Sequence, residues 1–479
     1  MRCGPQGTLK VWAYHPLDLG GIVNLTKHVA AGAAAMGLAA LLLLSGGCNS
    51  KAAETRPVSL QASTSTASAV ASTPAKTPQP TGTLADGTKI VLLAWNDLGM
   101  HCFNADFSKI AILPPYNNLY AQVVKVGEDP TPITSGLTVE YRYPDNTWSV
   151  GGPGKPQKSN FWMYAKALFG ADLKPDIGLT GRGLTGGLDA KAGFFVAQGI
   201  PVTDQRDVDA GTKNIYPYQL AEVTVKDSTG KAIAWTSVVT PVSTEMKCDK
   251  CHCKNGDACV QAGIKSVDDT YQNILLIHDK RQAATFKKLG YKLLVDSTPV
   301  LCASCHSDNA LGAAGKPGIS SMSNAMHLKH STVMDIKPTT EGCQKCHPGP
   351  ATKCLRDVHS QTLGFQCPTC HGDIKKVAAN TKPWLNEPRC NNQACHKNTP
   401  AAQLAQSDPL FKLSAGHHGN KIMCEGCHDS THALAQSREA NDGIKFVALQ
   451  GDRSYLKKCS VCHGVDSPDG QTKAHAPTN

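Results

Sequence analysis

The chain lacks any apolar run long enough to cross a membrane comfortably, and it is poor in aromatic residues. Its main apolar run, Val29 to Leu44, spans sixteen residues, whereas a transmembrane helix needs about 20. Aromatic residues make up 6% of the 479 residues, and no basic patch is interleaved with them. The net charge of +10 therefore does not indicate a nucleic-acid partner. From Cys248 onward the sequence also has few periodic apolar positions, which argues against a core built from side chains alone.

The apolar run and its surroundings have the form of an export signal. Lys27 precedes the run, and a zone of small residues ending at Cys48 follows it, as in a signal peptide with its cleavage site. This zone resembles a bacterial lipoprotein box in which Cys48 would be lipidated, although Ser45 occupies the position where such boxes usually carry leucine. Ordinary secretory cleavage is the alternative. Residues 1–22 carry no targeting pattern, so we predict a translation start at Val23.

The segment after the signal region of residues 1–48 is built from residues that do not form a core. Residues 49–87 are rich in Ser, Thr, Ala and Pro, which predicts a disordered linker. An acyl chain on Cys48 would make this linker a membrane tether. The 20 cysteines also suit an exported protein better than a cytosolic one.

A second region, residues 88–243, alternates strand-like runs with turn signals and contains a single cysteine, Cys102. The runs are Lys89–Trp95, Leu119–Val126, Leu137–Tyr143, Phe194–Gly199, Ala221–Lys226 and Ala232–Val239. The last two runs flank Asp227-Ser228-Thr229-Gly230, which predicts a hairpin, and a short helix is expected over Ser159–Leu168. This pattern predicts a β-rich, sandwich-like domain. No motif in it indicates an activity.

The most informative feature is a cysteine pair followed directly by a histidine, which occurs seven times. Six copies have the spacing C-x-x-C-H, and in the fifth copy four residues separate the cysteines. Numbered motif 1 to motif 7 in sequence order, they are Cys248-Cys251-His252, Cys302-Cys305-His306, Cys343-Cys346-His347, Cys367-Cys370-His371, Cys390-Cys395-His396, Cys424-Cys427-His428 and Cys459-Cys462-His463.

This spacing is that of covalent haem attachment. Two thiols a few residues apart form thioethers with the vinyl groups of one porphyrin, and the adjacent imidazole reaches its iron. Each motif therefore predicts one haem c, seven in total. Structural zinc and disulfides are the alternatives, but neither requires a histidine after every second cysteine. Seven haems within residues 244–479 would themselves form the core, so we expect short helices and loops wrapped around them.

Each motif supplies one iron ligand, and histidine is the first candidate for the second ligand. The candidate distal ligands are His278, His327, His330, His359, His417, His418 and His432, whereas His475 is a weaker candidate because it lies near the chain terminus. His327 and His330 would share one face of a helix and would serve two irons. His101 is either a further ligand or a structural residue. With Met100 and Cys102 it forms a cluster of soft donors, for which we prefer a packed turn to a mononuclear metal site.

Ligation by two histidines leaves no open position on an iron, which favours electron transfer over catalysis. The repeated motifs and the surplus histidines resemble those of multihaem c-type cytochromes, and the lipoprotein-like start is similar to the exported cytochromes of bacteria that respire metals. The resemblance covers the C-terminal half of the chain. It implies electron relay in the periplasm or at the outer membrane in anaerobic respiration. Other cytochromes, porin-associated complexes or extracellular metal acceptors would be the partners.

Two other functions stay open. An iron without a distal histidine would allow reduction of a small nitrogen or sulfur compound, although no C-x-x-C-K motif marks such a site. Assembly into a haem-containing filament is the other. Outside the motifs and the signal region, four cysteines remain, and Cys253–Cys259 and Cys102–Cys354 are candidate disulfides.

Overall fold

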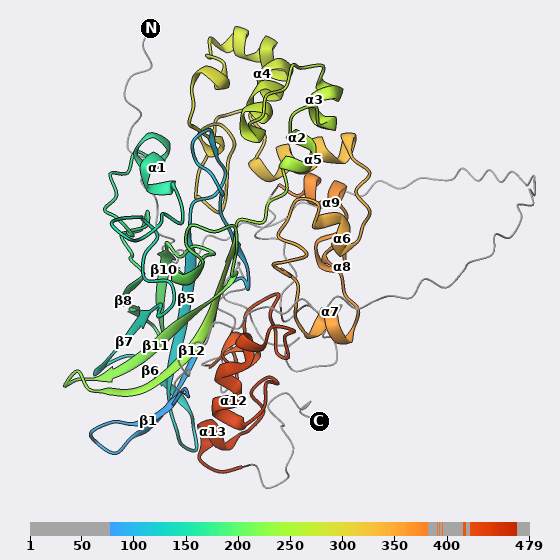
Figure 1. Ribbon diagram of the computed structural model, residues 1–479. Helices are drawn as coiled ribbons and strands as arrows, with labels where there is room; N and C mark the ends of the chain where they lie inside the picture. Colours follow the sequence, from blue (N-terminus) through green and yellow to red (C-terminus); the bar gives the residue numbers. More distant parts are fainter. Residues whose placement is uncertain are drawn as a thin grey trace, which may run out of the picture. The chain divides into compact units, whose positions relative to one another are not determined.

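The structure is a computed structural model that describes residues 77–381, 390, 392, 395 and 422–466, together with the backbone of residues 415–417. In this part of the chain a β-rich region comes first, and a region of loops and mostly short helices follows it (Figure 1). This coarse division agrees with the sequence prediction. The predicted signal region, Cys48, His396, His418 and His475 lie outside the described residues. Among the described helices, none is long and apolar enough to cross a bilayer.

Two sheets form the β-rich region. The first has the order β1-β2-β5-β10-β9, with β6 beside β5, and all its pairings are antiparallel. Its strands are β1 (Thr81–Thr83), β2 (Lys89–Asn96), β5 (Asn117–Lys125), β6 (Thr131–Ile133), β9 (Asp189–Lys191) and β10 (Phe194–Ile200). The second sheet has the order β3-β12-β11-β7-β8. Its strands are β3 (His101–Cys102), β7 (Leu137–Arg142), β8 (Thr185–Gly187), β11 (Tyr218–Asp227) and β12 (Ala232–Ser243).

The six predicted strands and the predicted helix are all present, with ends that differ by a few residues. The helix is α1 (Phe161–Phe169). The predicted hairpin joins β11 to β12, and Asp227 shapes its turn, since its carboxylate accepts hydrogen bonds from Thr229 N and Lys231 N at 2.9 and 3.1 Å.

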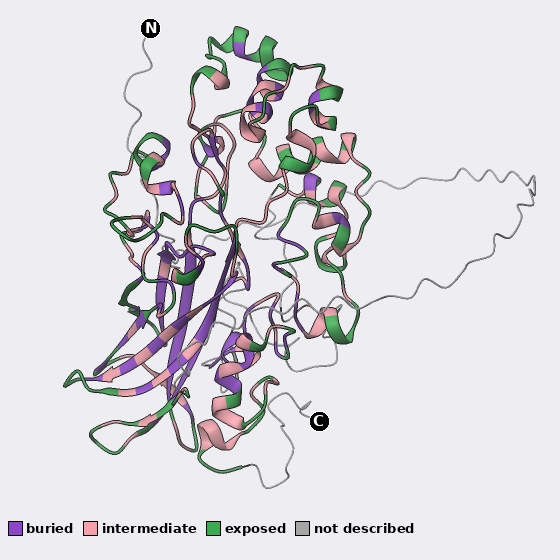
Figure 2. Cartoon of the chain, in the orientation of Figure 1, coloured by how far each residue is buried: buried purple, intermediate pink, exposed green. Residues whose placement is uncertain are grey.

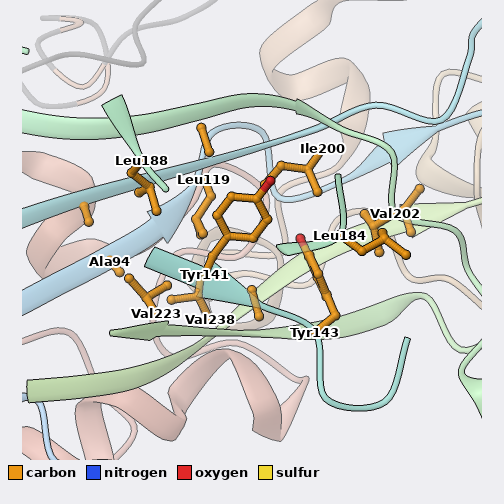
Figure 3. Close-up of a cluster of buried hydrophobic side chains, with 14 of the residues drawn as sticks. Ala94, Leu119, Tyr141, Tyr143, Leu184, Leu188, Ile200, Val202, Val223 and Val238 are labelled. Carbon is orange, nitrogen blue, oxygen red and sulfur yellow. The ribbon is translucent and has the colours of Figure 1, made fainter. Parts of the chain in front are cut away.

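The two sheets share one apolar core (Figure 3), in which Leu119 and Ala94 of the first sheet and Val223 and Val238 of the second are buried together with Tyr141. Strands β2 and β5 are buried on both faces (Figure 2), as the nearly unbroken apolar sequence of β2 requires. Alternate residues of β2 therefore face away from this core. There Trp95 and its neighbours pack against residues 422–462, including motif cysteines Cys427 and Cys462.

The second region contains helices separated by loops. They are α2 (Asp249–His252), α3 (Asp257–Ala262), α4 (Thr270–Leu289), α5 (Met322–Val333), α6 (Thr340–Cys343), α7 (Val358–Thr362), α8 (Cys367–His371), α9 (Ile374–Ala379), α11 (Cys424–His428), α12 (Ile444–Gln450) and α13 (Ser460–His463). Short strands join them: β13 (Val300–Leu301) pairs with β4 (Ile110–Ala111) of the β-rich region, and β14 (Ala415–His417) pairs with β15 (Ile422–Met423).

Two details of the sequence prediction are wrong. Strand β1 lies inside residues 49–87, for which a disordered linker was predicted, because it is held by backbone pairing with β2 and needs no apolar run of its own. Helix α4 has 20 residues, although only short helices were expected. Caps define both of its ends: the Asp269 carboxylate accepts a hydrogen bond from Gln272 N, and Gly290 ends the helix in the left-handed conformation.

Buried ion pairs join the second region to the first. The Arg356 guanidinium donates to both carboxylate oxygens of Asp442, at 2.7 and 2.9 Å, and to the carbonyl of Gly99 at 2.6 Å. Likewise, Lys445 Nζ donates to Asp429 at 2.7 Å and to the carbonyl of Ala94 at 2.8 Å. Buried charged groups therefore hold together three segments that are distant in the sequence: residues 94–99, the chain around Arg356, and residues 429–445.

Candidate haem-attachment sites

Each complete motif is folded into about one helical turn, which brings both thiols and the imidazole to the same side. In motif 1 the backbone N–H of His252 donates to the carbonyl of Cys248 at 2.9 Å, and motifs 2, 3 and 7 repeat this bond at 2.9–3.0 Å. Motifs 4 and 6 lie within helices α8 and α11. Residues i, i+3 and i+4 share a helix face, so the C-x-x-C-H spacing and this local fold are consistent.

The motif side chains border one continuous cavity of about 2400 Å³. Every motif cysteine lines it, and so do all the motif histidines among the described residues. A pocket for one drug-sized ligand measures about 300–1,000 Å³, so this cavity has room for several large groups. Apolar side chains such as Leu289 and Met326, which are 48% and 36% exposed, also line it, and their exposure is expected where a large apolar group belongs.

Four motif histidines each face a histidine from outside the motifs. The distances between ring centres are 6.4 Å for His252 and His330, 6.4 Å for His306 and His278, 6.0 Å for His347 and His327, and 6.1 Å for His371 and His432. The four non-motif histidines come from three separate stretches of chain: helix α4, helix α5 and the loop after α11. All four non-motif histidines also line the cavity.

These distances suit two imidazoles that bind one metal ion from opposite sides. A metal–imidazole bond is about 2.0–2.1 Å, so the two nitrogens would be about 4 Å apart and the ring centres about 6 Å apart. Ordinary aromatic packing also occurs at about 4.5–7 Å, but it gives no reason for each pair to join a motif histidine to a non-motif histidine. The residues present therefore fit haem with two histidine ligands at motifs 1 to 4.

Hydrogen bonds orient several of these rings. The Nδ1 atoms of His327 and His330 lie 2.8 and 2.6 Å from the carbonyls of Ser323 and Met326, one helical turn earlier in α5. His432 Nδ1 lies 2.9 Å from the carbonyl of Leu98 in the β-rich region. Because Nδ1 carries the proton in each of these bonds, Nε2 is left with the lone pair that a metal requires.

The rings are also in the neutral form that binds a metal. Burial, and then the facing His330, lower the pKa of His252 to about 4. Burial likewise lowers the pKa of His347 and of His371 to about 4, with the facing His327 and His432 as the next cause. All three rings are therefore uncharged near neutral pH.

Of the remaining predicted distal ligands, His359, His417 and His418, only His359 has a described side chain. His359 Nδ1 lies 3.1 Å from the Asp357 carboxylate, and its ring is stacked on Phe365 with the centres 5.8 Å apart. A carboxylate behind a histidine is a common support for a metal ligand. Only the backbone of His417 is described, and His396 and His418 lie outside the described residues, so the pairing at motif 5 is not shown.

His101 is held by the β-rich region. Its Nε2 lies 2.7 Å from the carboxylate of Asp97, four residues earlier, and its ring is 6.5 Å from that of Tyr116. Within the described residues, no group of three or more His, Cys, Asp or Glu side chains converges as a mononuclear metal site would require. Instead of the predicted turn, His101 and Cys102 form strand β3, which pairs with Val242 and Ser243 of β12.

The structure contains neither predicted disulfide, since all the described cysteines are free thiols. Cys259 Sγ points to the carbonyl oxygen of Cys253 at 3.7 Å instead of to its sulfur. Burial, and then the nearby Cys354 thiol, raise the pKa of Cys102, so these two residues are neighbours without being bonded.

Sequence reasoning missed several residues that position the motifs. Asn273 of α4 donates to the carbonyl of His252 at 2.8 Å, and Tyr455 is stacked on His428 with the ring centres 5.2 Å apart. Arg356 and Lys445 were missed as well. No local pattern could have revealed them, because each acts on a segment far away in the sequence.

Comparison with known proteins found no matching family model, no matching curated protein and no matching solved structure. The functional conclusion therefore depends on this chain's own residues.

Proposed function

We propose that this chain is a multihaem c-type cytochrome that relays electrons through seven covalently attached haems. The observation that carries the proposal is the set of four facing histidine pairs, each joining a motif histidine to another histidine across the cavity that all the motif cysteines line. A haem iron supplies one-electron redox chemistry.

The roles of the protein groups follow from their positions. The motif cysteines would form the thioethers, and the motif histidines would bind the irons from one side. His330, His278, His327 and His432 would bind from the other side at motifs 1, 2, 3 and 4. Iron with two histidine ligands has no open position for a substrate, which supports electron transfer. The β-rich region would serve as a scaffold, since its first sheet packs against motifs 6 and 7.

We further propose that the protein works outside the cytoplasm, in the periplasm or at the cell surface, where haem is attached to such motifs. Other cytochromes or redox proteins, an outer-membrane porin–cytochrome complex or an extracellular metal acceptor would exchange electrons with it. The chemical support is the group of seven motifs themselves, together with the signal-like run before Cys48.

The test is a haem count joined to a spectrum. The holoprotein, produced in a host that attaches haem c, should carry seven haems by intact mass, and the ferric protein should show low-spin EPR signals. The Cys343→Ser/Cys346→Ser variant should lose one haem, whereas the matched control Cys253→Ser/Cys259→Ser should lose none. A protein without covalent haem would refute the proposal. A stoichiometric high-spin signal would instead indicate an iron with an open position and a small-molecule reductase.

A further inference from the structure

The contacts between motifs relate each motif to particular neighbours, beginning with helix α4. Asn273 of α4 donates to the carbonyl of His252 in motif 1 at 2.8 Å. His278, five residues further along the helix, faces His306 of motif 2. Five residues of α-helix span about 7.5 Å, so one short stretch of α4 contacts both motifs. Motif 2 is thus a neighbour of motif 1.

Helix α5 makes the next connection. It carries both His330, which faces His252 of motif 1, and His327, which faces His347 of motif 3. Side chains three residues apart on a helix are direct neighbours. Motif 1 therefore lies next to motif 3, although motif 2 separates them in the sequence.

Thr340 joins motif 3 to motif 4. This residue begins α6, which ends at Cys343, and its hydroxyl lies 3.4 Å from the backbone nitrogen and 3.7 Å from the sulfur of Cys367. The backbone N–H of Thr340 donates to the side chain of Gln366 at 2.9 Å. Motifs 3 and 4 are therefore packed directly against each other.

The loop after motif 6 connects motif 6 to motif 4. His432, four residues after His428 of motif 6, faces His371 of motif 4.

The last connection joins motif 6 to motif 7. The backbone N–H of Leu456, just before motif 7, donates to the carbonyl of Cys427 at 2.8 Å. Cys427 and Cys462 both pack against the Trp95 side of the first sheet. In Figure 1 the helices that carry the motifs follow the same succession, from α2 through α6 and α8 to α13.

From these contacts we infer that motifs 2, 1, 3, 4, 6 and 7 follow one another in a row in this spatial order; motif 5, whose histidine lies outside the described residues, is not placed. Motif 2 stands at one end of the row, and motif 7 stands at the other. This inference rests on the proposed function, because the row conducts electrons only if each motif holds a haem. It makes the haems of motifs 2 and 7 the places where electrons enter or leave, and it makes the haem of motif 1 an internal one.

The direct test is the position of the irons in the unaltered protein. Anomalous scattering at the iron edge from crystals of the full-length holoprotein would locate them. The expected result is that the iron of motif 1 lies between those of motifs 2 and 3. An iron of motif 2 that lies between those of motifs 1 and 3, or that is nearer to motif 3 than to motif 1, would overturn the inference. A protein that contains no iron would refute the proposed function instead.

An electrode experiment tests the same order in solution. Val465, which is 71% exposed beside motif 7, is replaced by cysteine so that this end of the row is attached to gold. In this background the Cys302→Ser/Cys305→Ser variant removes the haem of motif 2, and the Cys343→Ser/Cys346→Ser variant removes that of motif 3. Haem content is first measured by absorbance.

The two variants should differ in a defined way. Without the haem of motif 2, all the remaining haems should exchange electrons with the electrode at the rate seen before its removal. Without the haem of motif 3, the haems of motifs 1 and 2 should exchange electrons with the electrode much more slowly, while the other haems should keep their original rate. Retention of fast exchange by every haem in the second variant, or its loss from internal haems in the first, would contradict the row.

Discussion

Removal of the buried guanidinium of Arg356 should cost far more stability than removal of a comparable exposed one. The Arg356 side chain is 1% exposed, pairs with both oxygens of Asp442, and lies 5.1 Å from the ring centre of Tyr218. In Arg356→Met, Asp442 keeps only its hydrogen bond from Ser437, at 2.5 Å. Breaking a buried ion pair from one side costs about 3–5 kcal/mol, so we expect a loss of that size in the free energy of unfolding.

Arg206 provides the comparison. It pairs with Asp209 at 2.7 Å and lies 4.4 Å from the ring centre of Tyr216, but its own side chain is 37% exposed and that of Asp209 is 10% exposed. Because solvent reaches this guanidinium and screens the pair, Arg206→Met should cost clearly less stability than Arg356→Met.

The assay is urea unfolding of the holoproteins at pH 7, followed by far-ultraviolet circular dichroism. The double variant Arg356→Met/Asp442→Leu should recover much of the loss, because no carboxylate is then left buried without its partner. Equal losses in Arg356→Met and Arg206→Met would refute the reasoning, and so would a double variant as unstable as the single one.

Three further predictions concern ligation, pH and backbone contact. His330→Met should raise the reduction potential of one haem in a potentiometric titration, because methionine replaces histidine on the iron, whereas His101→Gln should leave every potential unchanged. Hydrogen bonds from Thr352 and Lys247 outweigh burial and hold the pKa of Glu245 at about 2, below its usual 4.5. Its stabilising effect is therefore complete above about pH 4.5 and is lost as the pH falls toward about 2, so the stability difference between the wild type and Glu245→Gln in urea titrations should narrow over that range. Gly99→Ala should lower the melting temperature markedly, because a Cβ there would meet the carbonyl of Thr431 at 1.9 Å, whereas Gly87→Ala, with a similar positive φ but open space, should lose only about 1 kcal/mol. An unchanged potential in His330→Met, a pH-independent difference for Glu245→Gln, or equal losses in the two alanine variants would each contradict the corresponding reasoning.

Much of the fold was predictable because the signals are local. The run of apolar residues in β2 and the Asp227 turn depend on neighbours in the chain, and both were recognised from the sequence. Strand β1 was missed because its stability comes from backbone pairing with β2, which leaves no compositional mark. The residues that cover the outer face of β2 were not foreseen either. Its outer face is covered by residues that follow more than 300 positions later, beginning with Ile422.

For the candidate haem sites, too, the local motifs could be predicted from the sequence, whereas the long-range pairings could not. Each C-x-x-C-H motif was recognisable because the two thiols and the imidazole must lie within one turn of chain. The histidines outside the motifs could be named as a set of candidate distal ligands, but the sequence did not show which motif each one faces. His330 faces His252, and His432 faces His371, across distances in sequence that no local pattern encodes.

By itself, the sequence determined that this chain has seven cysteine–histidine motifs, a β-rich region before them and enough further histidines to pair with most of them. These properties depend on residue type and short-range spacing. Only the tertiary structure decided which histidine faces which motif, that helices α4 and α5 connect motif 1 to motifs 2 and 3, and that Arg356 and Lys445 join the motifs to the sheets. Those features depend on helices α4 and α5 and on buried charges that bring distant segments into contact, and such contacts form only when the whole chain packs.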